Sequence, residues 1–211
     1  MGQISYKQEL LRKMIHLSSL WMVCAIIFFK ENRLELGIFF AVCCILNIIL
    51  ERLVVLKVPV ITPLYGFFFK NMLRSEAKNA KWIISGSPPV WAAAALATLL
   101  FPTVAGASGL AVMLIADTAA ALIGRKFGRH KTYNNKSIEG IIAFNILGVI
   151  CMVIISRFFP ESWSWVYYLF GVVGVFLSSM AELFEKQLHI DDNFSIVIIN
   201  GLCLSAGLYF I

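Results

Sequence analysis

A single acidic residue, Asp117, stands near the end of a long apolar run that covers residues 104–124. A carboxylate inside a membrane-embedded helix costs several kcal/mol if it faces lipid, so such residues usually have a polar partner or a function. Two interpretations of Asp117 follow from its position. It is either a buried polar bridge between helices or part of a binding or catalytic site.

A cation-rich loop follows this apolar run directly. Between Arg125 and Lys136 it carries five lysine and arginine residues, and Ser137, Glu139 and Gly140 open the next apolar run. Taken alone, such a loop is also typical of a positively charged anchor on the cytoplasmic side of a membrane. Because the acid and the loop lie at the same end of one helix, we predict that together they bind an anionic, metal-bound phosphate.

Four acids form a second cluster within eleven positions, at Glu182, Glu185, Asp191 and Asp192, with Asn193 next to them. Capping of the following helix explains one of them. Hard oxygen ligands of this kind suit Mg²⁺, which binds one or two carboxylates together with nucleotide phosphates. The chain has no zinc pattern and no GxxxxGK[ST] loop, so a nucleotide would be bound in another way.

Two further polar groups precede these clusters. Arg12, Lys13 and His16 lie at the start of the first apolar run, and Arg12 and His16 share one helical face. They are interpreted either as an anchor at the membrane surface or as contacts to a phosphate or a lipid headgroup. Arg74 and Glu76, in a polar stretch near residues 70–87, leave the same choice open.

The elements that must position these residues are membrane helices. The chain of 211 residues is 60% hydrophobic and only 14% charged, which predicts an all-α, polytopic membrane protein with one integral-membrane domain over residues 1–211. Seven helices are expected, at 14–29, 34–50, 86–101, 105–123, 138–157, 164–181 and 194–211. The segment 53–69 contains two prolines and a glycine, so we expect it to be interfacial or re-entrant rather than an eighth span.

The distribution of positive charge predicts the orientation of these spans. With seven spans, most cations fall on the side of the N-terminus and of the loops 51–85, 124–137 and 182–193. The positive-inside rule then places this side, and every candidate site residue, in the cytoplasm. The net charge of +6 is explained by topology and lipid headgroups rather than by nucleic acid. A bacterial-type cytoplasmic membrane is the expected location.

The sequence resembles a family of membrane kinases that phosphorylate lipid alcohols, namely the dolichol kinases, phytol kinases and yeast-type diacylglycerol kinases. Four blocks carry the resemblance: Arg12-Lys13-x-x-His16; Leu73-Arg74-x-Glu76; Asp117 with Gly124, Gly128 and Lys136-Ser137-x-Glu139-Gly140; and Glu182 with Ile190-Asp191-Asp192-Asn193. Several family members use CTP as the donor. The resemblance therefore implies a Mg²⁺-dependent transfer of the γ-phosphate of CTP, or of another nucleoside triphosphate, to a polyprenol, a phytol-like alcohol or diacylglycerol.

Our hypothesis assigns the candidate residues to four roles. The catalytic group is Asp117, Lys136, Glu182 and Asp192. The nucleotide-binding group is Arg74, Gly124, Arg125, Gly128, Lys131, Lys136, Ser137, Glu139 and Gly140. The metal ligands are Asp117, Glu182 and Asp191. Further contacts to phosphate or headgroup are Arg12, Lys13, His16, Glu76 and Asn193.

Two other functions are weighed against the kinase. Phosphatidate cytidylyltransferases are similar in the central block and in an acidic stretch like residues 181–186, but their signature continues with Gly-His-Gly-Gly and Asp-Arg-x-Asp, which this chain lacks. A small non-enzymatic transporter would carry polar residues deep in several spans. Here Asn47 and Asn145 are the main ones, and both are explained as hydrogen bonds between helices. The sequence leaves open which alcohol is the acceptor, which group takes its proton, and the oligomeric state.

Overall fold

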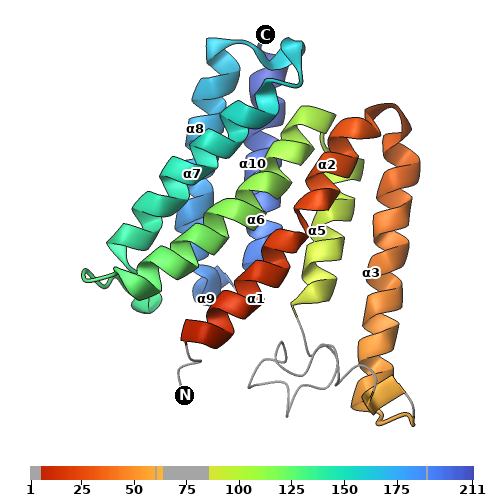
Figure 1. The fold of residues 1–211 in the computed structure, drawn as a ribbon. Helices are drawn as coiled ribbons and strands as arrows, with labels where there is room; N and C mark the ends of the chain where they lie inside the picture. The colour runs from red at the N-terminus through yellow and green to blue at the C-terminus, as the bar shows by residue number, and fades with distance from the viewer. Residues whose placement is uncertain (1–5, 60, 64–85, 189) are drawn as a thin grey trace.

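The computed structural model describes residues 6–59, 61–63, 86–188 and 190–211, and these residues form a bundle of helices (Figure 1). Six of the described helical segments are long and apolar enough to cross a membrane, and α5 is a shorter apolar helix. The expected all-α polytopic bundle is therefore confirmed. The elements are α1 (Tyr6–Ser18), α2 (Leu20–Phe28), η1 (Lys30–Asn32), α3 (Arg33–Val55), α5 (Ser87–Leu100), α6 (Thr103–Lys126), η4 (Tyr133–Asn135), α7 (Ile138–Ser156), η5 (Pro160–Ser162), α8 (Trp165–Leu183), α9 (Glu185–Leu188) and α10 (Asp192–Tyr209).

The first predicted helix, 14–29, is broken in the structure at Ser19. Helix α1 ends at Ser18 and α2 begins at Leu20. The hydroxyl of Ser18 donates to the Ile15 carbonyl at 2.6 Å, and such local side-chain bonds compete with the helical ladder and bend helices. The break lies three residues after His16, and both His16 and Ser19 line the cavity described below.

Helix α3 is longer than predicted. It continues to Val55 and takes up the first residues of the segment expected to be interfacial. The chain then turns at Lys57, whose φ of 56° is left-handed, while the Val58 amide donates to the Leu53 carbonyl at 3.1 Å. This pattern is a typical helix C-cap. Residues 60 and 64–69 of the same segment lie outside the described residues.

Helix α6 is the centre of the bundle, because it packs against α1, α2, α5, α7 and α10. Its small residues allow this close packing, as in many membrane helix pairs. A Cβ added at Gly106 would lie 2.0 Å from the Ala97 carbonyl oxygen of α5, and one at Gly140 of α7 would lie 2.8 Å from the Ala120 carbonyl oxygen. Asp117 is therefore carried on the most enclosed helix of the molecule.

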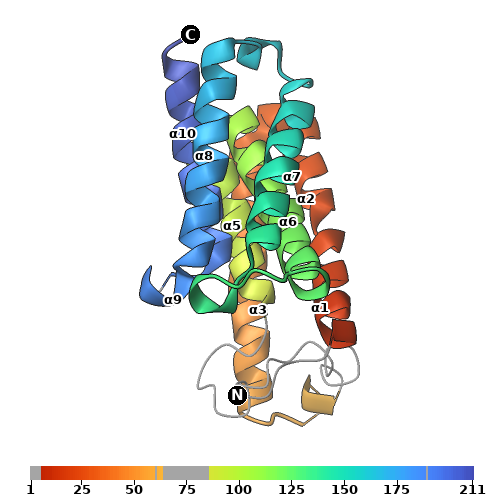
Figure 2. The ribbon, with the colours of Figure 1, turned by 90° about the vertical axis from the view of Figure 1, so that its left-hand side faces the viewer.

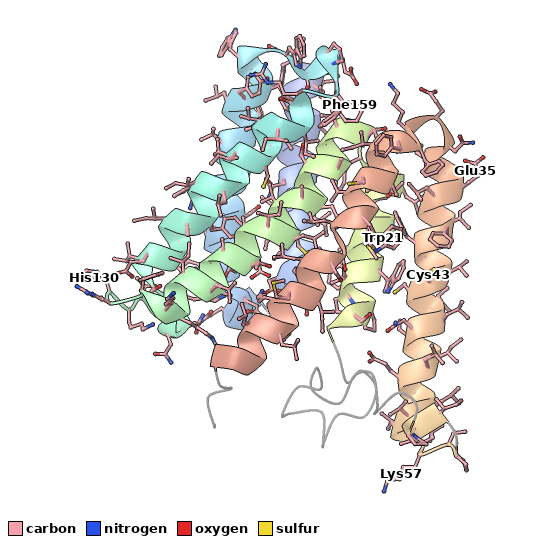
Figure 3. All side chains as sticks on the ribbon, in the orientation of Figure 1. Trp21, Glu35, Cys43, Lys57, His130 and Phe159 are labelled. Atoms are coloured by element: carbon pink, nitrogen blue, oxygen red, sulfur yellow. The ribbon has the colours of Figure 1, made fainter. Side chains whose placement is uncertain are left out.

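The two ends of the bundle differ in content. One end holds the N-terminus of α1, the loop 127–137 between α6 and α7, and α9, and we refer to it as the loop end (Figures 1 and 2). The other end holds the tight turns at 29–32 and 157–164, and we refer to it as the turn end. Figure 3 labels His130 and Lys57 at the loop end, and Phe159 and Glu35 at the turn end.

Candidate active site

Asp117 of α6 is paired with Lys13 of α1. The Lys13 ammonium donates to Asp117 Oδ2 at 2.5 Å, and the two side chains are only 6% and 5% exposed. His16, one turn further along α1, brings its Nε2 to 3.8 Å from the same oxygen. The polar partner that the sequence requires for Asp117 is therefore a cation of the N-terminal helix, which also fixes α1 against α6.

A second ion pair joins Lys136 to Glu182 of α8. The Lys136 ammonium donates to Glu182 Oε1 at 2.6 Å, and the carboxylate is 5% exposed. Burial acts to lower the pKa of Lys136, but the Glu182 carboxylate, followed by Asp117 and Asp192, outweighs burial and raises the pKa above its ordinary value. Lys136 is consequently a cation that is paired with Glu182 and influenced by the charges of Asp117 and Asp192, which come from other sequence blocks.

Glu139 organises the loop 127–137. Its Oε1 accepts hydrogen bonds from the backbone amides of Arg129 and His130 at 3.1 and 3.2 Å, and lies 2.8 Å from His130 Nδ1. Ser137 caps α7 by accepting from the Gly140 amide at 3.2 Å. In this structure Glu139 therefore orders the loop, while its predicted contact with the nucleotide stays a prediction.

Asn134 ties this loop to the end of α8, a link that the sequence analysis missed. Its Nδ2 donates to the Leu183 carbonyl and to Gln187 Oε1, both at 2.8 Å. Its backbone is left-handed, with φ of 54°, a conformation that asparagine adopts more readily than most residues. The Asn-Asn pair before Lys136 was the available signal for such a turn.

The glycines of the central block have a packing role in this structure. A Cβ at Gly128 would lie 2.1 Å from the Gly124 carbonyl oxygen and 2.6 Å from Ser137 Oγ, and one at Gly124 would lie 2.9 Å from Ser137 Oγ. These glycines bring the end of α6 against the start of α7. Close approach of a nucleotide to their backbone stays a prediction.

A cavity of about 120 Å³ adjoins the Lys13–Asp117 pair. Residues of α1, α5, α6 and α10, together with Ser19 and Gly86, line it. They are Arg12, Lys13, Ile15, His16, Ser19, Gly86, Ser87, Val90, Trp91, Asp117, Asp192 and Asn193. The sequence analysis singled out most of the polar members. It missed Ile15, Ser19, Val90 and Trp91, because single apolar or small residues in a membrane helix carry no signal of their own.

The start of α10 supplies the last candidate residues. Asp191 caps the helix by accepting from the Asn193 amide at 3.1 Å and also accepts from Asn193 Nδ2. The neighbouring Asp192 lines the cavity. Asn193 is 6% exposed, and its Oδ1 is buried without a hydrogen-bond partner among the described residues. One acid of the cluster is thus used for capping, as expected, while its neighbours face the cavity.

The predicted metal ligands Asp117, Glu182 and Asp191 are not assembled into one group. Within residues 6–59, 61–63, 86–188 and 190–211, no three His, Cys, Asp or Glu side chains are arranged to hold a metal ion. Each of the first two acids holds a lysine, and the third caps α10. The oxygen groups that do share the cavity are Asp117, Asp192 and the unpaired Oδ1 of Asn193, and hard oxygen donors of this kind fit Mg²⁺.

The remaining candidates lie around the two ion pairs or outside the described residues. Arg12 lines the cavity, and Arg125 and Lys131 are exposed at the loop end. Arg74 and Glu76 fall within 64–85, outside the described residues.

Comparison with known proteins gives two distant relatives. The chain is 26% identical over 161 residues to CTP-dependent diacylglycerol kinase 1 of Schizosaccharomyces pombe, an alignment that covers 69% of each chain. It is 27% identical over 142 residues to an uncharacterized protein of Rickettsia prowazekii, covering 67% of each chain. No model of a known family matches the chain, and no solved structure matches it.

Proposed function

We propose that this protein is a membrane lipid kinase that transfers the γ-phosphate of CTP, bound with Mg²⁺, to the hydroxyl of a lipid alcohol. The observation that carries this proposal is the presence of two lysine–carboxylate pairs, Lys13–Asp117 and Lys136–Glu182, at one end of a membrane bundle. The distant similarity to a CTP-dependent diacylglycerol kinase supports the same reaction class. The whole of residues 1–211 would form a single catalytic domain.

The charges of the two pairs match those of a metal-bound triphosphate. Lys13 and Lys136 would contact phosphate oxygens. The carboxylates of their present partners, Asp117 and Glu182, would then face the metal ion. Catalysis of phosphoryl transfer is mostly positioning and neutralisation of charge on the phosphoryl oxygens. The site already holds the cations and anions that a metal-bound triphosphate would meet, and the substrates would exchange the partners of the two ion pairs.

Mg²⁺ would be held by Asp117 and Asn193 and would neutralise charge on the phosphates when bound. In the reaction the oxygen of the lipid hydroxyl forms a bond to the γ-phosphorus, and the bond from that phosphorus to the β,γ-bridging oxygen breaks. CDP leaves with the bonding electron pair. Asp192 lines the same cavity and would accept the hydroxyl proton, directly or from the group to which the hydroxyl donates, before its release to water.

The loop 127–137 would hold the nucleotide. Lys136 faces the carboxylates, while Lys131 and Arg125 are exposed at the same end. Glu139 and Asn134 order the loop from two sides through their hydrogen bonds to Arg129, His130 and Leu183. Exposure of this loop suits a water-soluble donor that meets a lipid acceptor at the membrane surface.

The decisive experiment follows the label of CTP. Purified protein in detergent is given Mg²⁺, diacylglycerol, a polyprenol and phosphatidate, with CTP labelled at either the γ- or the α-phosphate. We expect lipid-soluble label from the γ position alone, and its loss when the metal is chelated. Label from the α position alone would indicate the cytidylyltransferase reaction, and absence of label from both positions would rule out both enzymes.

We also propose that the loop end faces the cytoplasm of a bacterial-type membrane. The positive charges of this end support the orientation through the positive-inside rule. The Lys131→Cys variant should react with a membrane-impermeant maleimide from the cytoplasmic side, whereas Glu161→Cys at the turn end should react from the other side. The reverse pattern, read against the unsubstituted protein, would overturn the orientation.

A further inference from the structure

The cavity beside Asp117 has walls of two kinds. Charged and polar groups of α1, α6 and α10 line it, and we refer to them as the polar wall; Ile15 of α1 with Val90 and Trp91 of α5 also line it, and we refer to these three as the apolar wall. The charged phosphates of a nucleoside triphosphate and its metal ion would not pack against the apolar wall. A ligand with a polar head and a hydrocarbon chain satisfies both walls at once.

His16 provides the polar wall with a free hydrogen-bond acceptor. The Met113 backbone of α6 hydrogen-bonds the His16 ring, while Nε2 is buried without a hydrogen-bond partner in the described part of the chain. Nδ1 therefore makes the bond to Met113, and because a carbonyl only accepts, Nδ1 carries the proton. In the neutral ring Nε2 is then an acceptor, which is complementary to a hydroxyl.

The apolar wall continues to the outer surface of the bundle. The Trp91 ring lies 5.8 Å from Trp21 of α2, and 6.1 and 6.5 Å from Phe40 and Phe39 of α3, between ring centroids. Trp21 and Phe39 are 47% and 48% exposed, and Figure 3 labels Trp21 on the side of α2 that faces α3. These rings form a continuous apolar path from the cavity to the lipid-facing surface.

From these observations we propose that this cavity is the acceptor site of the kinase. A lipid alcohol binds with its hydroxyl donating to His16 Nε2, and its hydrocarbon chain leaves past Trp91 into the membrane between α2 and α3. The assignment rests on the proposed function for the identity of the reaction. It adds which residues receive the acceptor: the alcohol lies beside Lys13 and Asp117, which would meet the phosphates and the metal ion, while the loop 127–137 would hold the rest of the nucleotide.

The hydroxyl requirement can be measured on the unmodified protein. The probes are a diacylglycerol and an isoprenoid alcohol, each with a photoreactive diazirine close to the hydroxyl-bearing end, and labelled residues are identified by mass spectrometry. We expect label on Ile15, Val90 or Trp91. The unlabelled alcohol should compete at least about tenfold better than its methyl ether, because the ether leaves the buried acceptor unpaired. Equal competition, or label confined to other helices, would overturn the site.

A matched pair of variants tests the cavity itself. Val90→Trp fills the cavity, whereas Val172→Trp makes the same change at a lipid-facing position that is 46% exposed. We expect Val90→Trp to raise the KM for the alcohol about tenfold or more and to abolish the label. Val172→Trp should change neither quantity. Unaltered labelling and KM in a folded Val90→Trp protein would contradict the site.

The same measurements separate failure of this site from failure of the kinase function. The two alcohol probes also distinguish an acceptor with two acyl chains from one with a single isoprenoid chain. A protein that transfers phosphate from CTP but is labelled elsewhere keeps the proposed function and loses this acceptor site. A protein with hydroxyl-dependent label in the cavity but no transfer from CTP keeps the alcohol site and loses the kinase function.

Discussion

The loop end and the turn end of the bundle satisfy their buried polar groups in different ways. At the turn end the partners are neutral: the Trp163 indole donates to the Ser156 carbonyl at 2.8 Å, and the Ser162 hydroxyl donates to the Phe159 carbonyl at 2.7 Å. At the loop end the partners are charged, and Lys13, Asp117 and Glu182 are almost fully enclosed. The same bundle therefore closes one end without buried charge and keeps buried charge at the other.

This difference indicates that the charges of the loop end are not required for stability alone. Neutral hydrogen bonds of the turn-end kind stabilise a structure by about 0.5–1.5 kcal/mol each. A buried ion pair often contributes no more than a well-packed apolar pair of the same size, because desolvation of the charges offsets their attraction. The loop end thus keeps two costly pairs where neutral contacts would suffice, which is expected of a site that must meet charged ligands.

The substitution Asp117→Asn is the strongest test of this difference between the loop end and the turn end. We expect turnover to fall by a factor of at least about 10²–10³, the effect of removing one electrostatic contact in a preorganised site. The change also carries a cost in stability, because Asp117 is buried in an ion pair. Breaking a buried pair by removing one partner costs up to about 3–5 kcal/mol, although the asparagine oxygen still accepts from Lys13. Turnover and unfolding in denaturant are measured together.

A double variant separates the two effects of this change. In Lys13→Met with Asp117→Leu both charges are replaced by apolar groups, so stability should return to near that of the unmodified protein. Activity should remain absent. Near-normal turnover in either variant would show that the Asp117 pair is a structural bridge, and the loop end would then resemble the turn end.

Lys136→Ala should have the next largest effect, on nucleotide binding. Loss of a hydrogen bond to a charged group costs about 1.5–3 kcal/mol, which corresponds to a rise of about 10–100-fold in the KM for CTP. Lys30→Ala, a matched change in the 29–32 turn at the other end, should leave the KM unaltered. An unchanged KM and rate in Lys136→Ala would remove this lysine from the site.

The raised pKa of Lys136 adds a pH expectation. Burial lowers this pKa, but Glu182, Asp117 and Asp192 raise it further. A lysine whose pKa is raised on folding contributes stability that is fully present below its unfolded pKa of about 10.4 and is lost only as the pH rises beyond that value. The stability difference between the unmodified protein and Lys136→Ala should therefore persist as the pH rises from neutral to about 10 and decline only above that value. If the pH is raised and the stability difference is already lost before about pH 9 is reached, the paired geometry of Lys136 is contradicted.

The fold was predictable from the sequence because hydropathy determines which segments cross a membrane. The run predicted at 105–123 lies within α6, Thr103–Lys126. The partner of Asp117 was not predictable, because Lys13 is 104 positions away and the pair depends on how α1 packs on α6. Val90 and Trp91 were missed for a related reason. An apolar residue that lines a cavity and one that faces lipid look alike in a membrane sequence.

Glu139→Gln should have a smaller effect than either ion-pair change. The amide oxygen of glutamine still accepts from the Arg129 and His130 amides, but the bonds are weaker than those to a carboxylate, and these amides lie in an exposed loop. We expect a few-fold rise in the KM for CTP and faster hydrogen exchange at these two amides. Exchange that stays slow would contradict the role of Glu139 in ordering the loop. A loss of activity as large as in Asp117→Asn would indicate direct contact with metal or phosphate.

Trp163→Phe at the turn end should have the smallest effect on activity. It removes the hydrogen bond from the indole to the Ser156 carbonyl, and it places a smaller ring beneath Arg157. The free energy of unfolding should therefore fall by about 1 kcal/mol. Because no candidate site residue lies at this end in the described part of the chain, kcat and both KM values should stay within about twofold. Loss of activity without loss of stability would show that the turn end takes part in the reaction, and the contrast between a structural end and a chemical end would no longer hold.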